Sequence, residues 1–260
     1  MTNKPPLISV CICTYRRPAL LEELLDTIYH QIAFPGPAEV VVVDNDALGS
    51  AADILATFSE KEPVLRSFQV PIQNISLARN KAVAEARGEW IAMIDDDEQP
   101  SPNWLDNLYR CAGETDADAV LGPVLPSFPE SAPRWIVEGK FFERPRHETG
   151  TAVSASETRS GNVLIKADLI RNLPGPFDPE FGLSGAEDSR LFGDLVAEGR
   201  RFIWCDEAEV EEILSADRLT GRWLMKRRFL TGRTYARMVL EKIASSRHKK
   251  TSKTFFVSRS

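Results

Sequence analysis

The chain has 260 residues, enough to bury one large hydrophobic core, or one core with a small appended subdomain. Hydrophobic residues make up 43% and charged residues 27%, proportions that exclude an intrinsically disordered chain. The N-terminus lacks the layout of a signal peptide, and no apolar run approaches the roughly 20 residues that cross a bilayer. We therefore expect a soluble, cytoplasmic protein, or one bound peripherally at the inner face of a membrane.

The net charge of -6 is unevenly distributed along the chain. From Arg218 to the end there are thirteen Lys and Arg residues and one acidic residue, Glu241, which gives this part a charge of +12. The first 217 residues carry the remaining charge of -18. An acidic body with a basic tail predicts that the tail meets an anionic partner, such as a membrane face.

The first hundred residues alternate between predicted strands and predicted helices. Short apolar, β-rich runs predict the strands, and apolar residues at helical spacing predict the first helix. We expect Gly88 to end the second helix, because glycine suits the left-handed position that follows a helix. The strands are expected at Leu7–Thr14, Glu39–Val43 and Glu89–Ile94, and the helices at Pro18–His30 and Ser76–Arg87.

This alternation predicts an α/β fold, with a Rossmann-like, mostly parallel central sheet flanked by helices. Ligands bind beyond the carboxyl ends of the strands in such sheets. Polar clusters follow all three predicted strands, so we expect them to meet at one site. The clusters are Thr14-Tyr15-Arg16-Arg17, Asp44-Asn45-Asp46 and Asp95-Asp96-Asp97.

The second half of the chain has weaker patterns. The stretch 126–160 is rich in proline and predicts a long loop region over the site, with a short strand or helix near Trp135. A strand is expected at Asn162–Ile165, and a helix at Asp188–Glu198 that Gly199 closes. The residues after Asp217 predict one or two basic, amphipathic helices.

The three aspartates indicate a metal site. Adjacent carboxylates at the end of a buried strand cost electrostatic energy unless a cation compensates them. A divalent ion such as Mn²⁺ or Mg²⁺, bound by one or two carboxylates and by diphosphate oxygens, meets that need. The alternative is a solvated turn, in which aspartate is common.

Four segments together resemble family 2 of the inverting glycosyltransferases, which have the GT-A fold. They are ISVCICTYRR, VVVDND, NISLARNKAVAEARGEWIAMIDDDE and SGAEDSRL, and they occur in the order found in that family. Each motif alone is moderately specific, but the ordered set is specific, and it spans about Leu7 to Arg200. The resemblance implies a transferase that moves a sugar from a nucleotide-sugar donor onto an acceptor hydroxyl, in the setting of bacterial envelope or exopolysaccharide synthesis.

The resemblance also implies roles for residues on the donor side. Thr14, Tyr15 and Arg16 would line the base and ribose, and Asp44 would accept a hydrogen bond from uracil, which favours a UDP-sugar. The remaining donor-side residues would be Arg79 and Asn162 near the nucleotide or sugar, Asp95 and Asp96 beside the ribose or sugar, and Asp97 as the metal ligand.

On the acceptor side, the resemblance implies that Asp188 is the catalytic base, with Glu187 beside it. An acceptor hydroxyl must lose its proton as it attacks the anomeric carbon, so a positioned carboxylate is required. The same two acids also suit the first turn of a helix, where the macrodipole favours them without any catalytic role. Both interpretations can hold at once.

These inferences predict a domain organisation. Residues 1–217 would form the catalytic domain, with the nucleotide-binding part at about 1–100 and the acceptor side at about 101–217, and residues 218–260 would form a basic helical extension. The processive members of the family carry a Gln-x-x-Arg-Trp motif and transmembrane helices, which are absent here. We therefore expect transfer of a single sugar, onto a glycan or a polyprenyl-phosphate-linked acceptor.

Other function classes fit less well. A sugar nucleotidyltransferase and a dinucleotide dehydrogenase both place a glycine-rich loop after the first strand, where this chain has Thr14-Tyr15-Arg16-Arg17-Pro18. A nucleic-acid-binding module is disfavoured because the body that carries the site is acidic. A non-catalytic nucleotide-binding module of a polysaccharide assembly complex remains an alternative, although it would not need Asp97 and Asp188.

Overall fold

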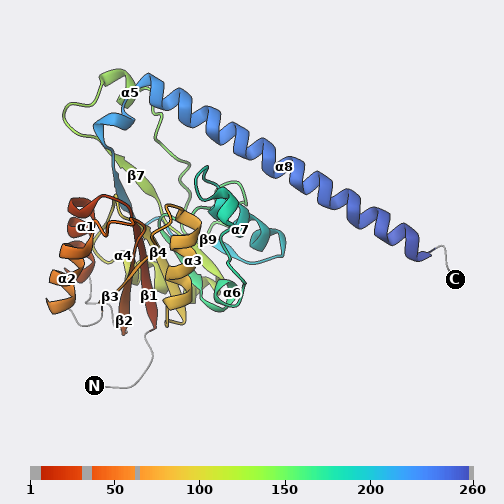
Figure 1. The fold of residues 1–260 in the computed structure, drawn as a ribbon, viewed down its shortest axis with the longest axis horizontal. Helices are drawn as coiled ribbons and strands as arrows, with labels where there is room; N and C mark the ends of the chain where they lie inside the picture. Colours follow the sequence, from red (N-terminus) through yellow and green to blue (C-terminus); the bar gives the residue numbers. More distant parts are fainter. Residues whose placement is uncertain (1–6, 31–36, 62–64, 258–260) are drawn as a thin grey trace.

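The computed structural model describes residues 7–30, 37–61 and 65–257; at Met238 and beyond Leu240 it describes the backbone alone. The side chains of the basic tail are therefore described only as far as Leu240. Within the described residues the chain forms an α/β fold from which one long helix extends (Figure 1).

A seven-stranded sheet forms the centre, in the order β3-β2-β1-β4-β8-β6-β9. The strands β1 to β4 run parallel to one another, whereas β8 is antiparallel to both of its neighbours. The mostly parallel sheet expected from the sequence is thereby confirmed. The strands are β1 (Ile8–Thr14), β2 (Ala38–Asp44), β3 (Leu65–Gln69), β4 (Trp90–Asp95), β6 (Ala119–Leu121), β8 (Val163–Lys166) and β9 (Phe202–Trp204).

Helices cover both faces of this sheet. Alternate residues of a strand point to opposite faces, so Val10 and Ile12 join one buried cluster while Cys11 joins the other. The first cluster lies under α1 (Pro18–His30), α2 (Ala52–Lys61) and α4 (Trp104–Thr115). The second lies under α3 (Ile75–Glu85), α6 (Asp168–Arg171) and α7 (Glu187–Ala197).

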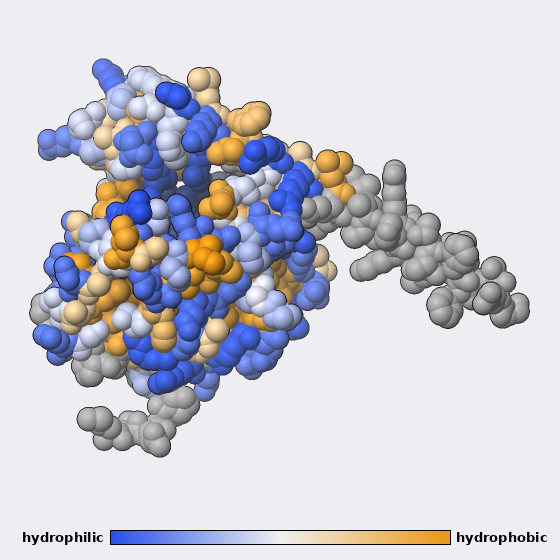
Figure 2. All heavy atoms as spheres, viewed as in Figure 1, coloured by the Kyte–Doolittle hydropathy of each residue, from blue (hydrophilic) through white to orange (hydrophobic). Residues whose placement is uncertain are grey.

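A second, three-stranded sheet has the order β5-β10-β7. Its strands are β5 (Glu98–Pro100), β7 (Val124–Ser127) and β10 (Val210–Ile213), and the remaining elements are α5 (Arg134–Glu138), the 3₁₀ turns η1 (Pro179–Phe181) and η2 (Ala216–Arg218), and α8 (Gly221–Val257). The short helix expected near Trp135 is α5. Figure 2 shows the surface recessed between the part that carries α5 and β7 and the body with the large sheet.

One glycine has a different role from the one predicted. The helix α3 ends at Glu85, and Gly88 does not adopt a left-handed conformation. Instead, a Cβ atom at Gly88 would lie 2.6 Å from the backbone nitrogen of Ser9 and 2.8 Å from the backbone oxygen of Trp90. Glycine is needed here because two strands pass close to the residue. Gly199, by contrast, has a φ of +90° directly after α7, as expected.

Candidate active site

The three polar clusters meet at the carboxyl ends of β1, β2 and β4, as the sequence predicts. In the parallel register Thr14 is paired with Asp44, and Cys13 is paired with Asp95. Because these strands are neighbours, their last residues lie side by side at one edge of the sheet. This is the edge at which open α/β sheets bind ligands.

Two of the three aspartates are buried and held by arginines. Asp96 accepts hydrogen bonds from Thr14 Oγ1 and Arg17 Nη1, each at 2.9 Å. The Oδ2 atom of Asp97 accepts from Arg17 Nη1 at 2.9 Å and from Arg218 Nη1 at 3.1 Å. Burial raises the pKa of Asp97 to about 6, and its acidic neighbours add to this effect, against the opposing effect of Arg17. Guanidinium groups thus supply part of the positive charge that these carboxylates require.

Arg79, on α3, connects the aspartate cluster to α7. Its Nη2 donates to Asp95 Oδ1 at 3.1 Å, and its Nη1 contacts Glu187 Oε1. Glu187 is only 4% exposed, and its Oε2 has no hydrogen-bond partner among the described residues. Burial raises the pKa of Glu187 to about 7, despite the neighbouring guanidinium. One side chain therefore connects two motifs that lie ninety residues apart.

Asp188 lies at the start of α7 and points to a different neighbour. Its Oδ2 accepts hydrogen bonds from the backbone nitrogen and the Oγ of Ser160, at 3.0 and 3.1 Å. Its Oδ1 accepts from the backbone nitrogen of Ser189 at 2.6 Å. The turn before the helix needs Gly185 at a φ of +81°, with Ala186 at +76°. The two successive acids thus have different partners, Arg79 for Glu187 and Ser160 for Asp188.

The segment before α7 is held by polar side chains of α3. Asn74, Ser76 and Asn80 make four hydrogen bonds of 2.7 to 2.9 Å to it. All of them go to backbone atoms, namely those of Phe177, Asp178 and Pro179. Asn74 also caps α3, since its side chain accepts from the backbone nitrogen of Leu77. Thus α3 positions both Arg79 and the approach to α7.

Asp44 supports the loop after β2. It is 3% exposed, and its two carboxylate oxygens accept hydrogen bonds from the backbone nitrogens of Asp46 and Ala51, both at 2.9 Å. A carboxylate oxygen can accept a second hydrogen bond. The expected contact of Asp44 with a uracil ring would therefore have to be made in addition to this loop-holding role.

Tyr15 and Arg16 lie at the mouth of the site. Arg16 has a φ of 56° and donates its Nη2 to Asp46 at 3.3 Å. Its guanidinium lies 5.0 Å from the centre of the Tyr15 ring. Both side chains remain accessible to a ligand, since Arg16 is exposed and Tyr15 is partly exposed.

Asn162 is placed differently from the expected donor contacts. It is fully buried, and its amide nitrogen donates to the backbone oxygens of Pro123 and Ala208 at 2.8 and 2.7 Å. Its Oδ1 accepts from Trp104 Nε1 at 2.7 Å. The amide group of Asn162 thus makes its hydrogen bonds within the core. The preceding Gly161 is the residue that approaches the site, since a Cβ there would lie 3.3 Å from Asp95 Oδ2.

The donor set at the strand end fits a divalent cation only in part. Among the described residues, no group of three or more His, Cys, Asp and Glu side chains is arranged to hold a metal. Asp97 Oδ1 and Asp95 Oδ2 have no protein partner in the described part of the chain, so two carboxylate oxygens are available. Mg²⁺ and Mn²⁺ are bound in this way when phosphate oxygens complete the coordination.

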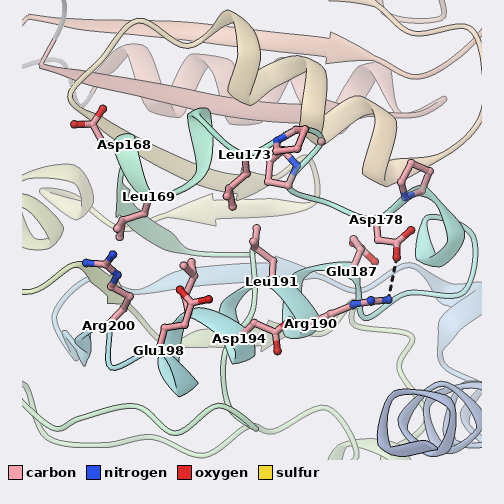
Figure 3. A pocket seen from close by; sticks show the side chains of 15 residues that line it. Asp168, Leu169, Leu173, Asp178, Glu187, Arg190, Leu191, Asp194, Glu198 and Arg200 are labelled. Carbon is pink, nitrogen blue, oxygen red and sulfur yellow. Dashed lines mark hydrogen bonds and ion pairs between the residues drawn. The ribbon is translucent and has the colours of Figure 1, made fainter. Parts of the chain in front are cut away.

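A cavity of about 730 Å³ lies between α7 and the segment 168–179. Figure 3 shows the side chains of Arg190 and Asp178 joined across it, at 2.9 Å. Five carboxylates and two arginines are among its lining residues, so its charge disfavours a diphosphate. These residues are Asp168, Asp178, Glu187, Asp194, Glu198, Arg190 and Arg200.

The sequence patterns assign no specific role to several residues of this site. Arg17 belongs to the predicted polar cluster after the first strand, and Ser160 lies two positions before Asn162. Arg218 had no such signal, because it contacts Asp97 across 121 positions of the chain. Its Nη2 also donates to Glu212 Oε1 at 2.5 Å, and Arg144 Nη2 donates to the other oxygen of Glu212 at 2.8 Å.

Comparison with known proteins agrees with the family resemblance of the four sequence segments. The family model described as "Glycosyl transferase family 2" matches residues 9–162, more than half of the chain. The succinoglycan biosynthesis protein ExoM of Rhizobium meliloti is 35% identical over 246 residues, which cover 93% of this chain and 78% of that protein.

Two groups of solved structures share the fold. The S. aureus TarS fragment 1–349, in complex with UDP-GlcNAc, has a TM-score of 0.59 at 20% identity. The mannosyltransferase PcManGT of Pyrobaculum calidifontis, with GDP-Man and Mn²⁺, has a TM-score of 0.61 at 22% identity. The matches cover 80% and 84% of this chain but only 58% and 59% of those chains. The expected GT-A fold is confirmed.

Proposed function

Because the chain belongs to glycosyl transferase family 2 and is a transferase, we propose that it moves a single sugar from a nucleotide-sugar donor onto an acceptor hydroxyl, with inversion at the anomeric carbon. The acceptor is a glycan or a lipid-linked saccharide of a polysaccharide under assembly. The role of the similar ExoM protein in succinoglycan biosynthesis supports this setting.

The bridge formed by Arg79 supports this proposal best. It joins Asp95, at the strand end where a nucleotide would bind, to Glu187, beside the acid that would act as base. A donor at the strand ends and an acceptor at the N-terminus of α7 would therefore meet across this guanidinium. Holding two reactants in a fixed geometry supplies a large part of the rate enhancement in such reactions.

Asp188 is the proposed general base. It would take the proton of the acceptor hydroxyl as the oxygen attacks the anomeric carbon. The hydrogen bonds from Ser160 and Ser189 fix the orientation of its carboxylate. Glu187 would hold Arg79 in place instead, because its accepting oxygen is directed to that guanidinium.

Asp97 and Asp95 would hold Mn²⁺ or Mg²⁺, which when bound would neutralise charge on the departing diphosphate. Arg17 and Arg218 already contact Asp97, and the half-exposed Arg17 would bind phosphate oxygens beside it. We propose UDP as the nucleotide because Asp44 lies at the end of β2. The fold alone does not select the base, since one structural neighbour carries UDP-GlcNAc and the other GDP-Man.

The decisive experiment is calorimetric binding and turnover of UDP-, GDP- and dTDP-sugars, with and without Mn²⁺. Wild type should bind one donor class, and Mn²⁺ should strengthen this binding. Asp97→Ala should lose the effect of the metal. Asp188→Asn should retain donor binding but lose at least about 100-fold in turnover. Asp53→Asn, an exposed aspartate of α2, is the matched control and should behave as wild type.

Two outcomes would contradict the proposal. If no nucleotide binds under any metal condition, the chain is a GT-A scaffold without a donor site. If Asp188→Asn turns over as wild type does, another group is the base, and Glu187 with its free oxygen is the next candidate.

A further inference from the structure

A stripe of apolar side chains lies exposed along α8. Met225 and Phe229 are each 71% exposed, Leu240 is 66% exposed and Val239 is 37% exposed. With the exposed Ala236 they follow the spacing i, i+4, i+11, i+14 and i+15, which places them on one face of a helix. We call these five residues the apolar stripe. Figure 2 shows orange, apolar atoms along the described part of this helix.

The opposite face of α8 is the one that packs on the body. Trp223 stacks on Phe142, with ring centres 5.7 Å apart, and Thr234 is only 5% exposed. Arg237 contacts Glu180, and its guanidinium lies 4.4 Å from the centre of the Phe181 ring. Since successive residues of an α-helix turn by about 100°, Thr234 lies roughly 180° from Met225. The apolar stripe therefore faces away from the body.

Positive charge borders the stripe. The segment 221–240 contains six Lys and Arg residues and no acidic residue. Arg222, Lys226, Arg228 and Arg233 are exposed and lie on the two sides of the stripe. Long basic side chains beside an apolar face can reach lipid headgroups while the apolar residues enter the acyl boundary. No helix in the described part of the chain combines the length and the apolar character needed to cross a bilayer.

From this arrangement we infer that α8 lies in the surface of an anionic lipid bilayer, with the apolar stripe inserted and the basic residues on the headgroups. Two other partners fit less well. A second copy of α8 would bring six positive charges against six, which opposes pairing. A nucleic acid would match the charge but would leave Met225, Phe229 and Leu240 in water. This surface does not depend on the proposed reaction.

The test is cosedimentation of the full chain with vesicles. One set is phosphatidylcholine alone, and the other adds phosphatidylglycerol at about one lipid in three. Wild type should bind the anionic vesicles, and added salt should weaken the binding. The double variant Met225→Gln, Phe229→Gln should lose at least about tenfold in partitioning, because each side chain loses its apolar transfer into the bilayer.

A matched double variant, Leu48→Gln with Leu183→Gln, changes two apolar residues of the body that are 84% and 78% exposed. It should bind vesicles as wild type does. Both double variants alter exposed side chains, so circular dichroism should show unchanged melting. In Phe229→Trp, anionic vesicles should produce a blue shift of the added fluorescence, and brominated lipids should quench it.

Equal vesicle binding by wild type and the stripe variant would overturn the inference. It would also be overturned if sedimentation without lipid shows a dimer that the stripe variant lacks, because the stripe would then be an interface between two copies.

Discussion

At the scale of single residues, arginines perform a task that the sequence suggested for a metal. Adjacent carboxylates require a nearby cation, and three guanidinium groups supply positive charge there. Arg17 and Arg218 contact Asp97, and Arg79 contacts Asp95. A metal at this site would therefore replace or supplement existing ion pairs, because the carboxylates already have arginine partners.

The bridge made by Arg79 has a direct test. In Arg79→Lys a single ammonium cannot reach Asp95 and Glu187 together with the planar fork of a guanidinium. We expect turnover to fall about tenfold or more, and the free energy of unfolding to fall by about 2 kcal/mol, because the buried Glu187 and the half-exposed Asp95 lose part of their pairing. Steady-state kinetics and urea unfolding measure the two effects.

Arg66 offers a matched control, because it also bridges two acids, Glu39 and Glu85, on a different part of the sheet. Arg66→Lys should lower stability but leave donor affinity unchanged. Should it impair turnover as much as Arg79→Lys does, the effect of Arg79 would be one of stability alone.

Single residues also show what the sequence could and could not indicate. The strand-end clusters were predictable because a short apolar run followed by acidic residues gives both the strand and its end. The role of Asn162 was not predictable. An asparagine that makes three hydrogen bonds in the core and an asparagine that contacts a ligand look the same in a sequence. Arg218 was not predictable because its partners come from distant parts of the chain.

At the scale of elements, the first hundred residues were the most predictable. The helix α1 has the bounds expected from its apolar spacing, and β1, β2 and β4 agree with expectation to within one residue at each end. The helix α3 has buried alanines and polar contacts instead of a clear apolar stripe, yet it was recognised. The short strands β5, β7 and β10 gave no periodic signal, since three or four residues carry too little pattern.

The junction between α3 and β4 depends on Gly88. In Gly88→Ala, the added methyl group would meet backbone atoms of Ser9, Trp90 and Ile8 within 3 Å, and backbone cannot move aside as a flexible side chain can. We expect a loss of about 2 kcal/mol or more in the free energy of unfolding. At Gly113, inside α4, an added methyl group would meet no atom within 4 Å, so Gly113→Ala should be neutral or stabilising by up to about 1 kcal/mol. Thermal unfolding of both variants decides this, and equal melting temperatures would contradict it.

At the scale of the whole molecule, the part of the chain after residue 217 is connected to the site. The proposed division into a catalytic domain and a basic extension remains a prediction. Arg218 nevertheless contacts Asp97 of the aspartate cluster and Glu212 of β10, and its guanidinium lies 5.2 Å from the centre of the Trp223 ring in α8. It thus joins the aspartate cluster and the three-stranded sheet to the long helix.

Replacing this arginine should therefore affect the whole fold. Arg218→Met leaves Asp97 and Glu212, whose side chains are 11% and 10% exposed, with less compensating charge. We expect a loss of about 3 kcal/mol or more in urea unfolding, together with weaker donor binding. Arg134→Met, which removes an ion pair of a 90% exposed arginine, should change stability by less than about 0.5 kcal/mol. Similar losses in the two variants would refute the joining role of Arg218.

The hydrogen bonds between α3 and the segment before α7 have a consequence for how such a protein can diversify. Asn74, Ser76 and Asn80 hold only the backbone of Phe177, Asp178 and Pro179. These four contacts therefore do not depend on the side chains of the segment. The buried Phe177 and the ion pair of Asp178 with Arg190 constrain those two positions. Substitutions at exposed positions such as Pro179 can reshape the neighbouring surface while the backbone before α7 stays in place. In the proposed transferase, new acceptor preferences would then arise without rebuilding the catalytic site.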